Sequence, residues 1–356
     1  MKHGDTNFEN YTKLLPDPAL FEGLSDEASL AWMQYLYARP KETTVKLNLR
    51  NHIISLYDPF ASRQTFPAGR RWCVNVYTGC AFHCTYCYTH NYIRNSTQPR
   101  IKKGFITRLE KDVIEIKNLG LHPAPIHISN STDPCQLLEK EYGYTLLVLK
   151  TIRDNRSFFS NITFLTKNPT MLCSDEYLEV VRKLPGFHVE VTCPFFNDET
   201  RKAFEPHAPS VSSRLRAIEK LRMNNVDVAI RIDPIFPRNP LPEAFFEKRS
   251  LADYDAPVSQ TQEDLESLIT FAHQTGINRL IVSPLKVVVG RFNPSELVPL
   301  YRKLFVAANK GKPLLKSLAY RMPWPLYRHW IEYPKAIAQA KGIDLIYCKN
   351  NLIETC

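Results

Sequence analysis

From residue 70 onward, short β-rich runs alternate with helical patterns, and this alternation constrains the fold more than any other feature. The expected strands, rich in Val, Ile, Phe and Thr, are 71–77, 125–129, 161–166, 188–192, 226–232 and 279–283. The helical patterns between them are 105–119, 141–154, 174–183, 212–224 and 263–273. Such alternation favours parallel strands with right-handed crossovers. Six units fall short of the eight that close a barrel, so we predict an α/β fold, a partial (βα)6 barrel.

Composition divides the chain into three parts. Residues 1–69 are expected to form an N-terminal helical and extended cap, with an amphipathic helix over 26–37 and a strand or two within 41–57. Residues 70–311 hold the partial barrel. Residues 312–356 form a basic, aromatic C-terminal extension, in which Tyr320, Trp324, Trp330 and Tyr333 lie among Lys and Arg. Aromatic rings among cations either stack on nucleic-acid bases or seal the bottom of the barrel.

Three cysteines lie close together just after the first expected strand. Cys80, Cys84 and Cys87 have the spacing C-x3-C-x2-C. Three thiolates can hold three irons of a [4Fe-4S] cube and leave the fourth iron open, whereas clusters usually have four cysteine ligands. The loop falls at the carboxyl ends of the strands, where catalytic groups of such folds collect. The spacing therefore predicts chemistry at an iron–sulfur cluster.

A zinc site is the main alternative for these cysteines. Cys84 and Cys87 form a C-x2-C pair, to which His83 or His90 would add a nitrogen ligand. A structural zinc ion needs four ligands, usually as two separated pairs, and no second close pair follows at that spacing. In this alternative the chain is a zinc-stabilised nucleic-acid-binding module without catalysis.

Several other classes of protein lack support in the sequence. The chain has 9 cysteines, an odd number, and no secretory signal pattern, which speaks against a disulfide framework. It has no G-x-S-x-G, no P-loop and no G-x-G-x-x-G motif among its 12 glycines. No apolar run approaches the length of a membrane span. We therefore expect no membrane partner and a cytoplasmic location, where reducing conditions suit thiolates.

The formal charge of +10 is unevenly distributed along the chain. Residues 70–110 hold seven basic side chains against one acidic, and residues 301–356 hold ten against three. Residues 1–69 hold seven basic and eight acidic side chains, a net charge of −1. DNA or RNA is the natural partner of such a positive field. A basic surface that binds nothing, or one that serves an anionic cofactor group or a small anionic substrate, stays open as an alternative.

Together these features resemble the radical SAM (S-adenosylmethionine) superfamily, and within it the spore photoproduct lyase-like group, also described as DNA-repair-photolyase-like. The loop Gly79-Cys80-x-x-His83-Cys84-x-Tyr86-Cys87-Tyr88 carries the resemblance. Further similar motifs are Ser131-Thr132-Asp133-Pro134, Leu165-Thr166-Lys167, the segment 204–214 and Arg231-Ile-Asp-Pro234. The resemblance covers residues 70–290.

The resemblance implies a lyase-like enzyme with a [4Fe-4S] cluster and S-adenosyl-L-methionine as cofactors, and a reductant such as flavodoxin or ferredoxin. The reduced cluster would cleave SAM to methionine and a 5′-deoxyadenosyl radical, which would take a hydrogen atom from the substrate. The group implies a nucleic-acid substrate, in DNA repair or modification. A peptide or small-molecule substrate is the alternative.

The resemblance also assigns roles to residues. Cys80, Cys84 and Cys87 would hold the cluster. The cofactor contacts would be Tyr86 beside the adenine, Ser129, Asn130 and Ser131 at the methionine end of SAM, Lys167 at its carboxylate, and Glu190 and Thr192 at the ribose. Arg231, a further cofactor-binding candidate, is expected to line the barrel in an ion pair with Asp233. His83 would hydrogen-bond backbone or cluster sulfur.

The sequence departs from the lyase at one position. The lyase has a hydrogen-donating cysteine just before its Thr-Ser-Asp segment, and the corresponding residue here is Asn130. Cys135 and Cys193 are candidate replacement donors, because an S–H bond is weak enough to quench a carbon radical; each is otherwise a packing thiol. Tyr88, the second tyrosine of the cysteine loop, is a third catalytic candidate. Cys73 is expected to be buried and inert.

Overall fold

The computed structural model describes residues 52–57, 71–119, 123–289, 297–308, 310, 315–316 and 319–347. Its main sheet has the strand order β1-β2-β3-β4-β5-β6-β7-β11. The strands are β1 (Ile54–Tyr57), β2 (Arg71–Val74), β3 (Ala124–Ile128), β4 (Phe159–Thr166), β5 (Phe187–Thr192), β6 (Asp227–Ile235), β7 (Arg279–Pro284) and β11 (Asp344–Tyr347). Strands β2 to β7 pair in parallel and in chain order. The predicted α/β fold, a partial barrel of six parallel strands, is confirmed.

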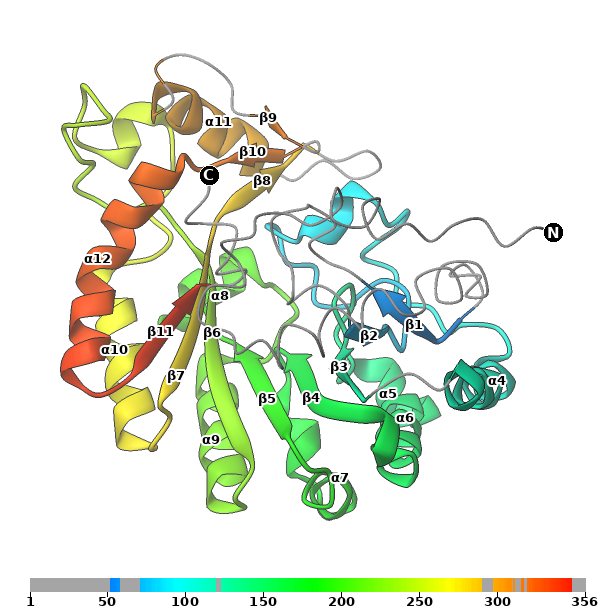
Figure 1. Ribbon diagram of the computed structural model, residues 1–356. Coiled ribbons are helices and arrows are strands. Elements are labelled where there is room, and N and C mark those ends of the chain that lie inside the picture. The colour runs from blue at the N-terminus through cyan, green and yellow to red at the C-terminus, as the bar shows by residue number, and fades with distance from the viewer. Residues whose placement is uncertain are drawn as a thin grey trace, which may run out of the picture.

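Helices follow the strands, and most of them cover the outer side of this curved sheet (Figure 1). They are α4 (Phe105–Leu119), α5 (Leu137–Tyr142), α6 (Tyr144–Asp154), α7 (Asp175–Val181), α8 (Asp198–Phe204), α9 (Val211–Met223) and α10 (Gln262–Gln274). Short 3-10 turns are η2 (Tyr88–Asn91), η3 (Arg156–Phe158), η4 (Pro169–Cys173) and η5 (Leu251–Tyr254). Side-chain caps fix several helix starts; Thr261 and Asp264, for example, form a reciprocal capping box at α10.

The two faces of the sheet differ in chemistry, because successive side chains of a strand point to opposite sides. On β2 and β3, Trp72, Val74, Ile126 and Ile128 are buried in the main hydrophobic core. The alternate positions, Cys73 and His127, are opposite one another in the strand register and belong to the other, inner face. The inner face of the partial barrel is therefore where polar chemistry can be placed.

Two sequence predictions about element ends were wrong. The helical pattern at 141–154 is divided into α5 and α6, because Gly143 adopts a left-handed φ of +62° that ends one helix and precedes the next. The first parallel strand ends at Val74 rather than at residue 77, because the chain leaves the sheet to form the cysteine loop.

Of the predicted N-terminal cap, the structure describes 52–57, where β1 pairs with β2 antiparallel. The helix predicted at 26–37 lies outside the described residues. Beyond the sixth strand, β8 (Lys286–Val288), β9 (Leu315–Lys316) and β10 (Ala319–Arg321) form a small sheet beside α11 (Leu297–Ala308). After α12 (Trp324–Ala340), β11 returns to the main sheet and pairs with β7 (Figure 1).

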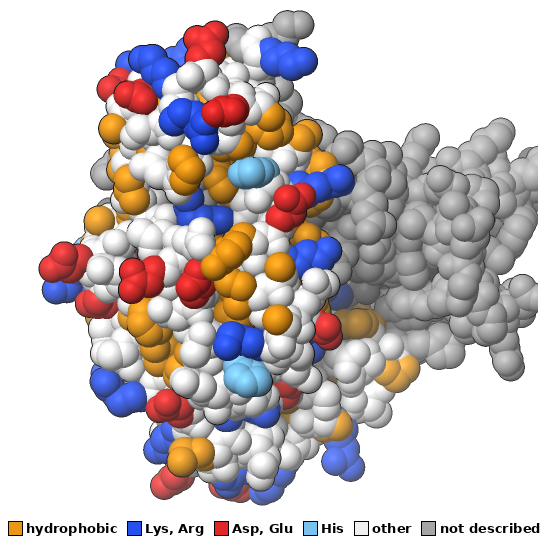
Figure 2. Space-filling view, turned by 90° about the vertical axis from the view of Figure 1, so that its left-hand side faces the viewer, with side chains coloured by type: hydrophobic (Ala, Val, Ile, Leu, Met, Phe, Trp, Pro, Cys, Tyr) orange, Lys and Arg blue, Asp and Glu red, His pale blue; other side chains and the backbone are white. Residues whose placement is uncertain are grey.

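The face on which α10 and α12 lie carries acidic and basic side chains mixed together (Figure 2). The positive excess of the chain is therefore not gathered on that side. None of the helices described here is both long and apolar enough to cross a membrane.

Candidate active site at the carboxyl edge of the barrel

The cysteine loop begins with a turn that requires glycine. Gly79 has a φ of +77°, and a Cβ there would lie 2.3 Å from the carbonyl oxygen of Gln98. The loop then folds back on itself: Cys80 N donates to Ser96 O at 2.8 Å, and Thr78 and Arg100 form an isolated antiparallel bridge. Backbone hydrogen bonds between residues 78–80 and 96–100 thus tie together the two ends of the segment that carries the cysteines.

Neighbouring segments hold this loop in place. Its Gly79 carbonyl accepts hydrogen bonds from Thr132 Oγ1 at 2.6 Å and Gln136 Nε2 at 3.2 Å, and Gln136 Oε1 accepts from Ala81 N at 3.0 Å. On its other side, Thr85 N donates to Phe204 O at 2.9 Å. The segments after β3 and at the end of α8 therefore clamp the cysteine loop from two sides.

The three thiols share one small apolar cluster. Cys84 is buried with Phe82 and Ala208, and the partly buried Cys80, Tyr86 and Cys87 pack against this group. Burial raises the pKa of Cys80 to about 12 and the pKa of Cys84 well above its ordinary value. Iron coordination would stabilise the thiolates that this environment otherwise disfavours. Three cysteines on one short loop, in an apolar shell, fit a [4Fe-4S] cluster with one open iron.

The geometry gives the zinc alternative no support among the described residues. In those parts of the chain, no three or more His, Cys, Asp or Glu side chains are arranged to hold one metal ion. A structural zinc ion needs four ligands converging on a single point. His90, one proposed extra ligand, is instead engaged by Ser96 Oγ at 2.6 Å and by the Cys84 carbonyl at 3.0 Å.

Beneath the cysteine loop lies a buried polar network that the sequence analysis did not assign. Glu205 accepts hydrogen bonds from the Tyr86 hydroxyl and from Arg214 Nη2, the latter at 2.5 Å, and its side chain and that of Arg214 are both 0 % exposed. Lys167 Nζ lies 3.9 Å from Glu205 Oε1 and 5.4 Å from the centre of the Tyr86 ring. Although burial alone would lower it, the neighbouring Cys84 and Glu205 raise the pKa of Lys167, which stays a cation.

For Glu205 and Arg214 the sequence signal was the segment 204–214, which resembles the lyase-like group but suggested no role for either residue. Tyr86 and Lys167, which were predicted as two separate cofactor contacts, lie side by side in this network. Tyr86 is fixed by its hydroxyl, and its ring also meets that of Phe236 edge-on.

The predicted methionine-binding segment follows β3 directly. Ser129 has a φ of +68°, is fully buried, and its Oγ has no hydrogen-bond partner. Asn75 Oδ1 accepts from the backbone N–H groups of Asn130 and Ser131 at 2.9 and 2.8 Å. Asn130 Nδ2 donates to Cys73 Sγ at 3.0 Å. An unpartnered buried hydroxyl on a rigid turn fits a segment that binds a polar cofactor group.

Asp133 links this segment to the end of β4. Its carboxylate accepts from Thr166 Oγ1 at 2.8 Å, Lys167 N at 2.6 Å and Cys135 N at 2.9 Å. It sits in a motif that the sequence analysis quoted without giving Asp133 a role. Asp133 therefore positions the strand end from which Lys167 projects.

On β5 and β6 the predicted ion pair is present. Arg231 binds Glu190 Oε2 and Asp233 Oδ2, each at 2.5 Å. Burial would raise the pKa of Glu190, but the guanidinium of Arg231 holds it well below its usual range. Thr192 is opposite Arg231 in the register, and its carbonyl accepts from Arg214 Nη1 at 2.9 Å.

The catalytic candidates differ in their access to the site. Cys135 and Cys193 are both 0 % exposed in the main hydrophobic core, and Cys193 Sγ donates to Phe195 O at 3.4 Å. Tyr88 is 48 % exposed, and its hydroxyl donates to the Asn130 carbonyl. His83 bonds the carbonyl of Thr97 at 2.8 Å. Roles for these residues stay predictions.

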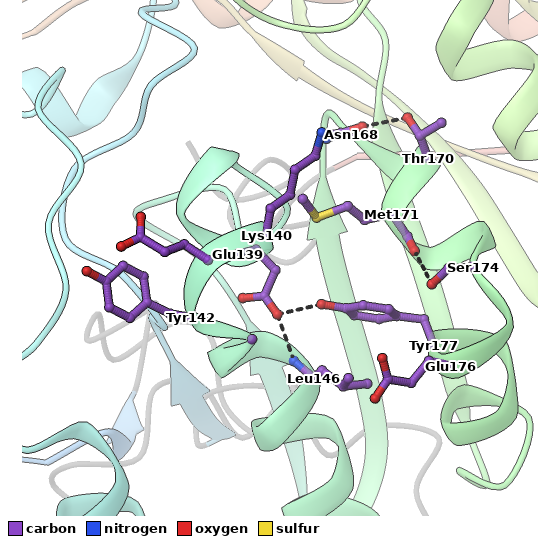
Figure 3. Close-up of a pocket in the computed structure, with 12 residues that line it drawn as sticks. Glu139, Lys140, Tyr142, Leu146, Asn168, Thr170, Met171, Ser174, Glu176 and Tyr177 are labelled. Atoms are coloured by element: carbon purple, nitrogen blue, oxygen red, sulfur yellow. Dashed lines mark hydrogen bonds between the residues drawn. The ribbon is translucent and has the colours of Figure 1, made fainter.

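A separate cavity of about 800 Å³ lies between α5, η4 and α7 and contains none of the predicted site residues. Figure 3 shows Glu139 at its base, where the carboxylate accepts from Tyr177 Oη at 2.5 Å and Leu146 N at 3.1 Å. Tyr77 Oη and Thr145 N complete the set of donors. Since all of its donors come from the protein, Glu139 serves to fix the break between α5 and α6.

Comparison with known proteins identifies the class of this domain. The model of the radical SAM superfamily matches residues 74–241, which include the cysteine loop and β2 to β6. This region therefore matches the radical SAM superfamily, and the resemblance inferred from the sequence is confirmed.

Individual proteins and solved structures are also similar to this chain. An uncharacterized protein of Methanocaldococcus jannaschii is 26% identical over 197 residues, which cover 54% of this chain and 70% of the relative. An uncharacterized protein of Mycobacterium tuberculosis is 25% identical over 179 residues, 47% of this chain and only 50% of the relative. A spore photoproduct lyase complexed with dinucleoside spore photoproduct has a similar fold, with a TM-score of 0.55 and 13% identity over 80% of this chain and 78% of that chain.

Proposed function

We propose that this chain is a radical SAM enzyme that cleaves SAM reductively at a [4Fe-4S] cluster held by Cys80, Cys84 and Cys87. The observation that carries the proposal is the clamped three-thiol loop beside Lys167 and the unpartnered Ser129 hydroxyl, all at the carboxyl edge of the sheet. When bound, the reduced cluster and SAM together supply a radical that abstracts hydrogen from the substrate.

The chain's own residues bind and orient the cofactor. The Lys167 cation would pair with the SAM carboxylate, while Ser129, Asn130 and Ser131 hold its methionine end. Glu190 and Thr192 would contact the ribose, with Arg231 keeping Glu190 ionised. The buried shell under the loop keeps water from the reacting centre.

We propose a nucleic-acid substrate for repair or modification. The excess of positive charge in residues 70–110, around the cysteine loop, supports this choice. So does the shared fold with a lyase that was solved with a dinucleoside photoproduct. Because the sequence resemblance puts Asn130 where the lyase-like group implies a cysteine, we propose a different hydrogen donor. Tyr88, Cys135 and Cys193 are the candidates, and Tyr88 is the exposed one.

An anaerobic assay tests the proposed chemistry. The full chain is reconstituted with iron and sulfide, reduced, and given SAM; 5′-deoxyadenosine is then quantified. The control replaces Cys80, Cys84 and Cys87 with Ala, and a second control replaces Cys173, a cysteine outside the loop. Production that requires only the three loop cysteines is the expected result. Tightly bound zinc without iron, and no 5′-deoxyadenosine, would refute the proposal in favour of a binding module.

A salt series tests the proposed substrate class. Binding of single-stranded DNA or RNA should weaken steeply as salt rises, because each neutralised phosphate releases counterions. SAM cleavage without any salt-dependent binding of nucleic acid would point instead to a peptide or small-molecule substrate.

A further inference from the structure

The inner face at the start of β2 and β3 collects basic side chains. Arg71 and Cys73 are two residues apart and so lie on the same side of β2. Cys73 is the register partner of His127 on β3, which places these two side chains on neighbouring strands about 5 Å apart. Lys102, from the segment before α4, is near enough for its charge to act on the pKa of Cys73, as does that of Arg71, although burial raises that pKa overall.

Two buried polar atoms of this group lack hydrogen-bond partners among the described residues. Arg71 Nε, which can only donate, and His127 Nδ1 are buried atoms for which no hydrogen-bond partner is found. No ion pair or hydrogen bond joins the Lys102 ammonium to another described residue. Burial lowers the pKa of Lys102 to about 8, against the smaller raising effects of Cys73 and Asp112. Burial and the charge of Arg71 lower the pKa of His127 to about 3, so that ring is neutral and carries one N–H.

The nearby carboxylates are already occupied. Asp112 accepts from His52 Nδ1 and from the backbone N–H groups of Ile53 and Ile54, the last two at 2.6 and 2.8 Å. Glu190 is bound by Arg231. The charge of Asp112 acts on Lys102, but neither carboxylate forms an ion pair with Arg71 or Lys102. Both cations are half-buried, and leaving partly desolvated cations without an ion pair is costly. An anionic ligand would remove that cost.

We propose that Arg71, Lys102 and His127 form a subsite for a phosphate group of the substrate. Arginine offers a planar fork of donors, lysine a point charge and neutral histidine a single N–H, which together suit a group with several anionic oxygens. The subsite adjoins the cofactor segment, because Cys73 accepts a hydrogen bond from Asn130 at 3.0 Å. This inference rests on the proposed function: a backbone phosphate held here would place the adjoining nucleoside near the cysteine loop.

Binding of fluorescein-labelled oligothymidylate to the reconstituted full chain tests the subsite. Arg71→Gln and Lys102→Gln should each weaken binding by about ten- to a hundredfold. Each should also lower the slope of log affinity against log salt by about 0.7, the value for one lost phosphate contact on a single strand. Lys150→Gln and Arg153→Gln remove the same charge from the exposed surface of α6 and should change the affinity little.

Two further probes identify the source of the phosphate. An oligothymidylate with an uncharged methylphosphonate backbone should bind the wild type and both subsite variants equally weakly. If inorganic phosphate binds the wild type, is lost from both variants, and is not displaced by oligothymidylate, the subsite stands but takes a small phosphorylated molecule.

The subsite is refuted if Arg71→Gln and Lys102→Gln retain wild-type affinity and salt slope for oligothymidylate, and wild-type affinity for inorganic phosphate. Iron content and thermal midpoint establish that the variants are folded. Formation of 5′-deoxyadenosine without nucleic acid is measured on the same samples. Failure of the wild type in that assay would count against the proposed function, whereas unchanged binding by active variants would count against the subsite alone.

Discussion

Replacing Arg214 with Met should destabilise the fold strongly, because it leaves a fully buried carboxylate without its cation. Arg214 donates to Glu205 at 2.5 Å and to the carbonyls of Thr192 at 2.9 Å and Pro209 at 3.0 Å, and its side chain is 0 % exposed. Breaking one partner of a buried pair costs about 3–5 kcal/mol. Lys167, 3.9 Å from Glu205, would offset only part of this loss.

The assay compares thermal midpoints and iron content. Since about 1 kcal/mol moves the midpoint of a large domain by about 2–4 °C, Arg214→Met should lower it by roughly 6–20 °C. Lys150→Met is the matched control: its partner Glu176 lies at 2.9 Å, but both side chains are exposed, so about 0–1 kcal/mol is expected. Adding Glu205→Met to Arg214→Met should restore much of the loss, because both charges are then absent.

Equal effects of Arg214→Met and Lys150→Met, or a double variant less stable than Arg214→Met, would refute this reasoning. Because Glu205 also holds the Tyr86 hydroxyl under the cysteine loop, Arg214→Met should retain less iron after reconstitution than Lys150→Met. If Arg214→Met is unstable but keeps its full iron content, then the Arg214–Glu205 pair stabilises the barrel without being needed to hold the cysteine loop.

Three further variants test other parts of the site. The ion pair with Arg231 holds the pKa of Glu190 below its ordinary value of 4.5, so the stabilisation it gives the fold is present above pH 4.5 and is lost as the pH falls. Glu190→Gln should therefore lower the free energy of unfolding more at pH 7 than at pH 3. An equal loss at both pH values in urea titrations would contradict the ion pair. Gly79→Ala should cost at least about 1–2 kcal/mol and reduce iron binding, measured by thermal melts and metal analysis, because φ is +77° and the new Cβ would meet Gln98 O. Lys167→Met should weaken SAM binding at least about tenfold by calorimetry, while Lys150→Met should leave it unchanged.

The order of elements could be predicted because it depends on local patterns. All six parallel strands and the helix at 105–119 lie where their residue pattern places them. The errors came from backbone conformation that the pattern does not reveal. Gly143 could be a tolerated glycine within one helix, and only its left-handed φ divides α5 from α6.

Within the site, the residues that could be predicted carry their own chemical signature, as the three cysteines do. The supporting residues could not, because their roles come from contacts across long stretches of chain. Tyr86 and Glu205 are 119 residues apart, and Asp133 reaches Thr166 and Lys167 across 33 and 34 residues. Nothing in the sequence around Glu205 or Asp133 distinguishes these buried carboxylates from carboxylates on the protein surface.

Cys73 is a residue whose burial could be predicted from the sequence but whose surroundings could not. Its position in an apolar run indicates a buried packing thiol, and it is indeed 4 % exposed. Yet strand alternation puts it on the inner face, where it accepts a hydrogen bond from Asn130 and lies on the strand next to His127. Burial alone does not distinguish the core between sheet and helices from the inner face of an open barrel. The unpartnered atoms of Arg71 and His127 make that distinction, because an apolar core would not leave buried donors without acceptors.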